Sequence, residues 1–65
     1  MKIGFIGLGI MGRPMAKHLV NAGYDVMVTD LNQELVSELV GMGAGTGSYS
    51  EIGSQCDIVM MILPN

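Results

Sequence analysis

Three short apolar runs, each of strand length, occur at residues 2–6, 24–29 and 57–63. A fourth segment, residues 44–47, has poor strand propensity, and we expect a strand there only because the repeating pattern requires one. Between these segments the apolar residues recur with helical spacing. Such alternation predicts parallel strands joined by right-handed helical crossovers.

The first helical segment is expected to begin near Met11, because Pro14 is tolerated only in the opening turn of a helix. Gly23 is well placed as the residue that ends it. The apolar stripe that we expect to lie on the sheet consists of Met11, Met15, Leu19 and Ala22.

The second helix is predicted to start after Asn32, a favourable N-cap, with Glu34 in its first turn. It should run to about Val40, and Gly41 should stop it. Its buried side is expected to comprise Leu35, Val36, Leu39 and Val40.

Residues 48–51 read Ser-Tyr-Ser-Glu, a capping box that predicts a third, short helix to about Gln55. The element order is then βαβαβαβ. We therefore predict an α/β, Rossmann-type doubly wound parallel sheet with strand order 3-2-1-4 and a ligand crevice between the first and fourth strands. Residues 1–65 are expected to be the N-terminal part of a dinucleotide-binding domain, with its remainder and a helical substrate domain outside this chain.

A G-x-G-x-x-G motif, Gly7, Gly9 and Gly12, stands between the first strand and the first helix. The motif alone is weak evidence, but here the second strand also ends on an acid, Asp30, 18 positions after Gly12, near the separation of about 20 typical of dinucleotide-binding proteins. Gly7 would permit the tight turn, Gly9 would let the backbone meet a pyrophosphate, and Gly12 would let the helix pack on the strand. A glycine-rich turn without a ligand is the less favoured alternative.

The backbone N–H groups at the helix start, with the helix dipole, are expected to hold the diphosphate, while Arg13 is expected in solvent. Asp30 should accept hydrogen bonds from the adenosine ribose, although a solvent-facing acid opening a turn is an alternative. A 2′-phosphate would be repelled there, and the next three residues include no base, so NAD is favoured over NADP. The expected cofactor-binding residues are Gly7, Leu8, Gly9, Ile10, Met11, Gly12, Asp30, Leu31, Leu63, Pro64 and Asn65.

The amino-acid composition further restricts the possible functions. With 49% hydrophobic and 14% charged residues, the chain is too apolar for disorder. Its net charge of −3 and three basic residues make nucleic acid an unlikely partner, and no apolar stretch approaches a membrane span. The single cysteine, Cys56, excludes an intrachain disulfide and favours the cytoplasm. We expect Cys56 to be a small buried apolar residue, His18 to lie on the surface, and no metal site.

Read as one string, residues 4–16 resemble the N-terminus of the β-hydroxyacid dehydrogenase family, which includes 3-hydroxyisobutyrate dehydrogenases and tartronate semialdehyde (2-hydroxy-3-oxopropionate) reductases. Residues 56–65 resemble the family's fourth strand and its leucine-proline turn. His18 departs from the family, which usually carries Asn at that place.

The resemblance implies an NAD-dependent enzyme, an oligomer of identical subunits, that interconverts a small 3-hydroxy acid and its semialdehyde by hydride transfer. The family's catalytic lysine and its neighbouring asparagine lie further along the chain, so the resemblance supplies no catalytic residue here. The 65 residues alone are expected to be inactive. A non-catalytic nucleotide-binding module remains the main alternative. Imine and 6-phosphogluconate-type oxidoreductases also share the architecture, whereas a methyltransferase is disfavoured because its loop typically reads G-x-G-x-G.

Overall fold

The computed structural model describes residues 1–62, apart from the side chain of Ile10. Strands and helices alternate along these residues, as predicted. They are β1 (Lys2–Ile6), α1 (Gly9–Asn21), β2 (Asp25–Thr29), α2 (Gln33–Gly41), β3 (Gly45–Thr46), α3 (Tyr49–Gln55) and β4 (Ile58–Met61).

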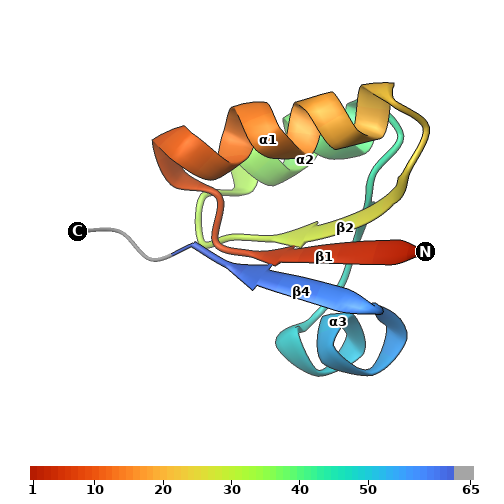
Figure 1. The fold of residues 1–65 in the computed structure, drawn as a ribbon. Helices are drawn as coiled ribbons and strands as arrows, with labels where there is room; N and C mark the ends of the chain where they lie inside the picture. The colour runs from red at the N-terminus through yellow and green to blue at the C-terminus, as the bar shows by residue number, and fades with distance from the viewer. Residues whose placement is uncertain (63–65) are drawn as a thin grey trace.

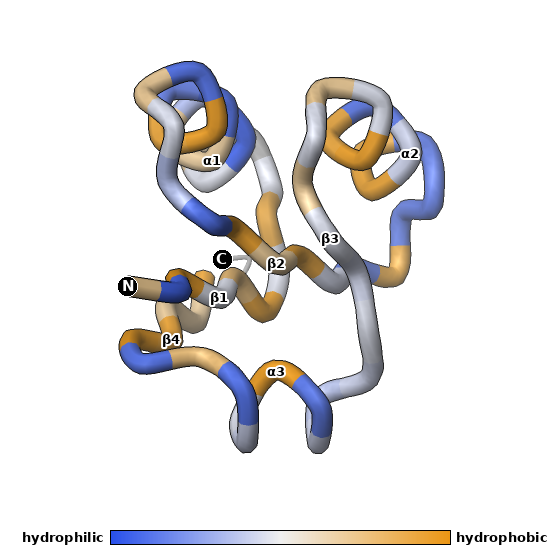
Figure 2. Tube along the Cα trace, turned by 90° about the vertical axis from the view of Figure 1, so that its right-hand side faces the viewer, coloured by the Kyte–Doolittle hydropathy of each residue, from blue (hydrophilic) through white to orange (hydrophobic). Residues whose placement is uncertain are grey.

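The four strands form one parallel sheet in the order β3-β2-β1-β4, which confirms the predicted Rossmann-type arrangement. Helices α1 and α2 cover one face of the sheet and α3 covers the other (Figures 1 and 2). Residues Ile3, Val26 and Ile58 lie side by side on the three longer strands. Because the strands are parallel, their carboxyl ends lie at the same end of the sheet, and the segments after β1 and β2 meet there.

The main core fills the space between the sheet and the pair α1 and α2. Its buried members are Ile3, Phe5, Leu8, Ala16, Val26, Val28, Val36, Leu39 and Ala44. On the opposite face, Ile52 of α3 is fully buried. A methyl group on Gly4 would lie 2.5 Å from Ile52 Cγ2 and 2.9 Å from Cys56 Sγ, so this glycine lets α3 approach the sheet.

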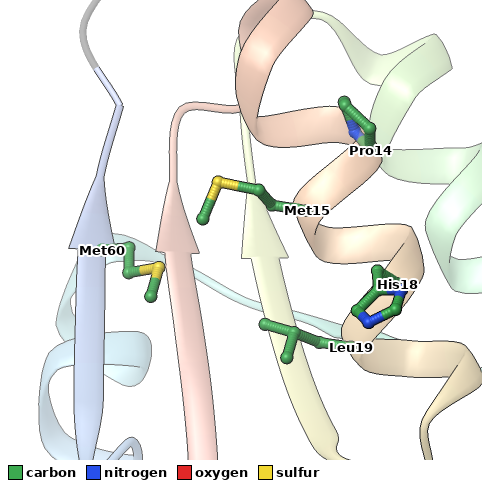
Figure 3. A pocket seen from close by; sticks show the side chains of 5 residues that line it. All are labelled: Pro14, Met15, His18, Leu19 and Met60. Carbon is green, nitrogen blue, oxygen red and sulfur yellow. The ribbon is translucent and has the colours of Figure 1, made fainter.

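The predicted apolar stripe of α1 is wrong in two of its four positions, since Met11 is 77% exposed and Ala22 is exposed. Leu19 is partly buried against the core, and Met15, although 44% exposed, extends over the sheet beside Leu19 (Figure 3). The side that faces inward carries Gly12 and Ala16 instead. The helix begins at Gly9, two residues before the expected start, and its small residues let the backbone lie close to the sheet.

The end of α2 also differs from the prediction. Gly41 is the last helical residue, and the chain turns away at Gly43, whose φ of 113° is in the left-handed region. Of the predicted buried side of this helix, Val36 and Leu39 are buried, whereas Val40 is 42% exposed. Leu35 is partly buried.

Strand β4 lies at the edge of the sheet and is shorter than the apolar run that predicted it. Its residues Ile58, Val59 and Met61 are 43%, 37% and 66% exposed. A continuous apolar run indicates burial on both faces in a parallel sheet, but residues 1–62 supply cover for only part of this strand. No helix in this part of the chain is long and apolar enough to cross a membrane.

Candidate cofactor-binding site

The glycine loop is held between the ends of two neighbouring strands. The N–H of Gly7 donates to the carbonyl oxygen of Thr29 at 2.8 Å. Gly7 has φ 80°, and a Cβ there would collide with the carbonyl oxygen of Ile62, so the position requires glycine. Gly12 is less strictly constrained, because its Cβ would lie 2.5 Å from Ile62 Cδ1, the end of a side chain that can shift. The loop is therefore packed against the segment that follows β4.

Gly9 differs from both, because open space surrounds the position of its missing side chain. Its φ is 57°, and a Cβ built there would have no other atom within 4 Å. The constraint on this glycine thus comes from its backbone conformation and not from the protein around it. The opening leaves room for a ligand to approach the backbone of the loop.

The N-terminus of α1 lacks the side-chain cap that the other two helices of residues 1–62 possess. Leu8 is the N-cap of α1 and makes no side-chain cap bond, and the first turn contains no acidic residue. In α2, by contrast, Asn32 Oδ1 accepts from the N–H of Glu34 at 3.0 Å. In α3 the predicted capping box of Ser48 and Glu51 is present. The first turn of α1 therefore combines a positive dipole end with N–H groups that helical bonds leave free, which suits an anion.

Asp30 links the end of β2 to the glycine loop. Its Oδ2 accepts from the N–H of Leu8 at 2.6 Å, and its Oδ1 accepts from the N–H of Asn32 at 2.8 Å. These donors, Asn32 first and with it the N–H groups of the loop, lower the pKa of Asp30 against the opposing effect of burial. An ionised carboxylate offers about four acceptor positions, so lone pairs remain for ribose hydroxyls. The residues present therefore fit the predicted diphosphate and ribose.

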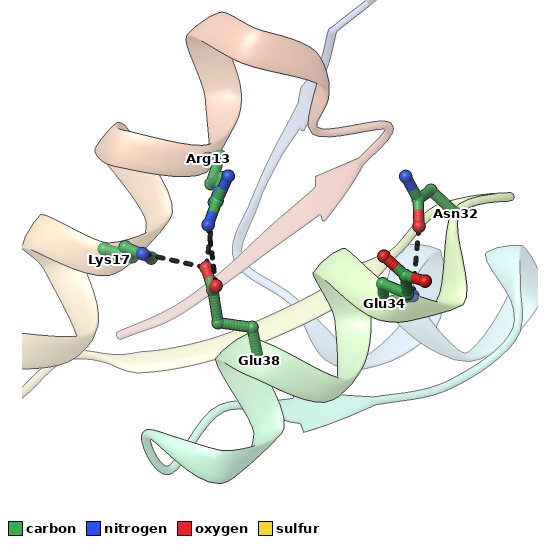
Figure 4. Close-up of polar contacts among 5 residues, drawn as sticks. All are labelled: Arg13, Lys17, Asn32, Glu34 and Glu38. Carbon is green, nitrogen blue, oxygen red and sulfur yellow. Dashed lines mark hydrogen bonds and ion pairs between the residues drawn. The ribbon is translucent and has the colours of Figure 1, made fainter.

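The side chain of Arg13 reaches solvent, as predicted, with 42% of it exposed, and its guanidinium also forms a bidentate ion pair with Glu38 of α2 (Figure 4). Its Nε lies 2.8 Å from Glu38 Oε1 and its Nη2 lies 2.6 Å from Glu38 Oε2. Lys17 Nζ approaches the same carboxylate at 2.8 Å. Hydrogen bonds from Arg13 and Lys17 lower the pKa of Glu38 to about 2. The sequence offered one signal, since Arg13 and Lys17 are four positions apart on one helix face, but the partner lies on another helix.

The remaining predicted site residues stand around the loop. Leu31 is 92% exposed beside Asp30, and Met11 is exposed in the first turn of α1. Ile10 lies in the same turn. Leu63, Pro64 and Asn65 fall outside the described residues. The N–H of Ile62 donates to the carbonyl oxygen of Ile6 at 3.0 Å, so the chain just before them still runs along the carboxyl edge of β1.

A hollow lies on the α1 face of the sheet, towards β4. It has a volume of about 400 Å³ and is lined by Pro14, Met15, His18, Leu19 and Met60 (Figure 3).

His18 is exposed, as predicted. Cys56 is only partly buried, and burial raises the pKa of its thiol. Within residues 1–62 no group of three or more His, Cys, Asp or Glu side chains is placed to hold a metal ion.

Comparison with protein families gives one match over nearly the whole chain. The model of the NAD binding domain of 6-phosphogluconate dehydrogenase matches residues 2–65. This match confirms the kind of cofactor predicted from the glycine motif.

Curated relatives show the same relationship. The chain is 42% identical to glyoxylate/succinic semialdehyde reductase 2, chloroplastic, of Arabidopsis thaliana, over 97% of this chain and 18% of that protein. It is 39% identical to 2-hydroxy-3-oxopropionate reductase of Escherichia coli, over 100% of this chain and 22% of that protein. It is 45% identical to NAD-dependent L-serine dehydrogenase of Pseudomonas aeruginosa, over 97% and 22%. The chain thus spans about a fifth of the length of these relatives.

Solved structures agree with the fold. A 3-hydroxyisobutyrate dehydrogenase of Mycobacterium tuberculosis matches with a TM-score of 0.86 and 36% identity, over 97% of this chain and 22% of that one. An imine reductase from Bacillus cereus matches with a TM-score of 0.88 and 31% identity, over 98% and 23%. These matches confirm the resemblance that the glycine string indicated.

Proposed function

The chain belongs to the family of NAD binding domains of 6-phosphogluconate dehydrogenase, and on that premise we propose that it supplies the cofactor-binding part of an oxidoreductase. The proposed reaction is hydride transfer between a nicotinamide cofactor and a small 3-hydroxy acid, of the 3-hydroxyisobutyrate or 2-hydroxy-3-oxopropionate type. The observation that carries the proposal is the uncapped N-terminus of α1 beside the ionised carboxylate of Asp30.

In the proposal, different residues around the loop bind different parts of the cofactor. The N–H groups of the first turn of α1, from Gly9 to Met11, would hold the diphosphate, and Gly9 would let the backbone touch it. Asp30 accepts hydrogen bonds from the adenosine ribose hydroxyls. Leu31 would flank the adenosine. Leu63, Pro64 and Asn65, which follow β4, are proposed to border the nicotinamide side.

Asp30 also favours NAD(H) over NADP(H). At a separation of about 4 Å and an effective dielectric constant of about 20, two like charges repel by roughly 4 kcal/mol. The segment after Asp30 offers a 2′-phosphate only the uncharged residues Leu31, Asn32 and Gln33. When bound, NAD supplies the hydride acceptor, while this chain fixes the two anchoring groups of the cofactor.

The substrate class is proposed from the relatives, several of which are named for hydroxy acids or their aldehydes. Imine reduction is a second candidate, favoured by the imine reductases among the similar structures. We place the protein in the cytoplasm on its single cysteine and expect an oligomer of identical subunits.

Two measurements test the proposal. Calorimetric titration of the chain with NAD⁺ and NADP⁺ should show binding that favours NAD⁺. Assays of the natural protein that carries these residues, with 3-hydroxyisobutyrate, 2-hydroxy-3-oxopropionate and cyclic imines, should show turnover of a hydroxy acid or its semialdehyde. NAD⁺ binding without turnover of any of them would support a non-catalytic nucleotide-binding module instead, and absence of dinucleotide binding would contradict the proposal altogether.

A further inference from the structure

Two of the three Lys and Arg side chains of this protein form ion pairs with a single acid, Glu38. Arg13 and Lys17, both on α1, contact the carboxylate of Glu38 on α2 (Figure 4). The third base, Lys2, lies at the amino end of β1, 3.9 Å from Asp25 at the start of β2. Arg13 is thus the basic residue closest in sequence to the glycine loop, and its guanidinium is bound by Glu38.

The ion-pair cluster of Arg13, Lys17 and Glu38 joins α1 to α2. Arg13 is four residues from Gly9 along α1, a rise of about 6 Å. Glu38 is four residues from Glu34, which stands in the first turn of α2 beside Asn32 and Asp30. The cluster therefore lies about one helical turn from the edge where a ribose 2′-substituent would be.

Glu38 holds Arg13 by hydrogen bonding and charge, and burial contributes little. The side chains of Arg13 and Glu38 are 42% and 36% exposed. No other acceptor within the described part of the chain hydrogen-bonds to the guanidinium of Arg13. Without the carboxylate, the long and flexible arginine side chain is free to turn towards the loop. A guanidinium is also the group that best matches a phosphate, because it donates two parallel hydrogen bonds.

We propose that Glu38 is a specificity-determining residue that favours NAD(H) over NADP(H) by keeping Arg13 away from the 2′-phosphate position. The inference rests on the proposed function, since it assumes that the dinucleotide binds at the glycine loop. Specificity is a difference of two affinities and is raised as effectively by denying a contact to the wrong ligand as by improving the right one. Asp30 repels the 2′-phosphate, and Glu38 removes the cation that would offset this repulsion.

The test is the ratio of NADP⁺ to NAD⁺ affinity in Glu38→Gln, measured by calorimetry on the full chain. Glutamine keeps the size of the side chain but loses the charge that holds Arg13. The ratio should rise roughly threefold to tenfold, as expected for one partly exposed charge-assisted contact. Asp25→Asn makes the same change of net charge at the amino end of β2, away from the glycine loop, and should leave the ratio unchanged.

The double variant Arg13→Gln/Glu38→Gln identifies the source of the change. It restores the net charge of the wild type and should return the ratio to the wild-type value. A ratio that stays raised in the double variant, or does not rise in Glu38→Gln, overturns the inference. If Glu38→Gln fails to fold by circular dichroism, Glu38→Asp serves instead, because the shorter acid keeps its charge but cannot reach Arg13 in the same two-pronged geometry. A wild type that binds neither dinucleotide refutes the proposed function, whereas an unchanged ratio with NAD⁺ binding intact refutes only the role of Glu38.

Discussion

The backbone N–H of Leu8 donates a hydrogen bond of 2.6 Å to Oδ2 of Asp30, a residue 22 positions away. Leu8 is the N-cap of α1, and Asp30 is the first residue after β2. One carboxylate therefore fixes the start of the helix that we propose binds the diphosphate, and in the same proposal its remaining lone pairs accept from the ribose. Both proposed anchoring points of the dinucleotide would then depend on a single contact between the segments that follow β1 and β2.

Asp30→Ala should weaken NAD(H) binding by roughly 1.5–3 kcal/mol, the range for a hydrogen bond that involves a charged group. The same change should reduce the difference in affinity between NAD(H) and NADP(H), because the repulsion of the 2′-phosphate disappears. Fluorescence or calorimetric titration measures both effects, with Asp25→Asn as a control for the loss of one negative charge. A wild type that bound NADP(H) more tightly than NAD(H) would show that Asp30 does not set the preference.

Gly9→Ala should abolish measurable cofactor binding and leave the fold largely intact. The new methyl group would meet no protein atom within 4 Å, so it would occupy only the space proposed for the pyrophosphate. The left-handed backbone adds a strain of roughly 1–2 kcal/mol. Gly23→Ala is the matched control, since Gly23 also has positive φ and open surroundings but lies beyond the far end of α1. It should show similar destabilisation in thermal melts and normal NAD⁺ affinity. Unchanged affinity in Gly9→Ala would mean that this loop does not hold the phosphates.

Local signals in the sequence predicted the caps and the strand order well. Asn32, the Ser48–Glu51 capping box and Gly23 each act within a few residues of the helix end that they define. The parallel sheet followed from the alternation of elements and the handedness of crossovers, and the order β3-β2-β1-β4 from the usual order of Rossmann-type sheets. The caps depend on neighbouring residues and the parallel pairing on general chirality, so a single sequence contains enough information for both.

Features that depend on how distant segments meet were not predictable in the same way. The predicted stripe failed at Met11, which was chosen for its hydrophobicity, whereas close packing on the sheet places Gly12 and Ala16 inside. The pairing of Arg13 with Glu38 depends on the relative placement of α1 and α2, which no local pattern records. The glycine loop was predicted as a unit, but its contact with Ile62 required the position of β4.

Acid should remove the stabilisation that the ion pair of Glu38 provides. Its pKa is lowered from 4.5 to about 2 in the folded chain, so its contribution is present above about pH 4.5 and is lost as the pH falls towards 2. Over this range the melting temperature of the wild type should fall more steeply than that of Glu38→Gln. Circular dichroism melts at low ionic strength measure the difference, and about 1 M salt should reduce it by screening. Parallel curves for the two proteins would mean that the pair contributes no stability.

The exposed edge of the sheet leads to the last prediction, that the chain self-associates through β4. Ile58, Val59 and Met61 are exposed apolar residues on a strand that pairs on one side only, with β1, in the described part of the chain. Such an edge offers unpaired backbone groups to another strand, and an inserted lysine is the usual protection against this. Met61→Lys should therefore shift the chain towards monomer in sedimentation velocity experiments, whereas Tyr24→Lys, at a residue 51% exposed before β2, should not. A wild type that remains monomeric at high micromolar concentration, or equal association in both variants, would exclude β4 as the contact.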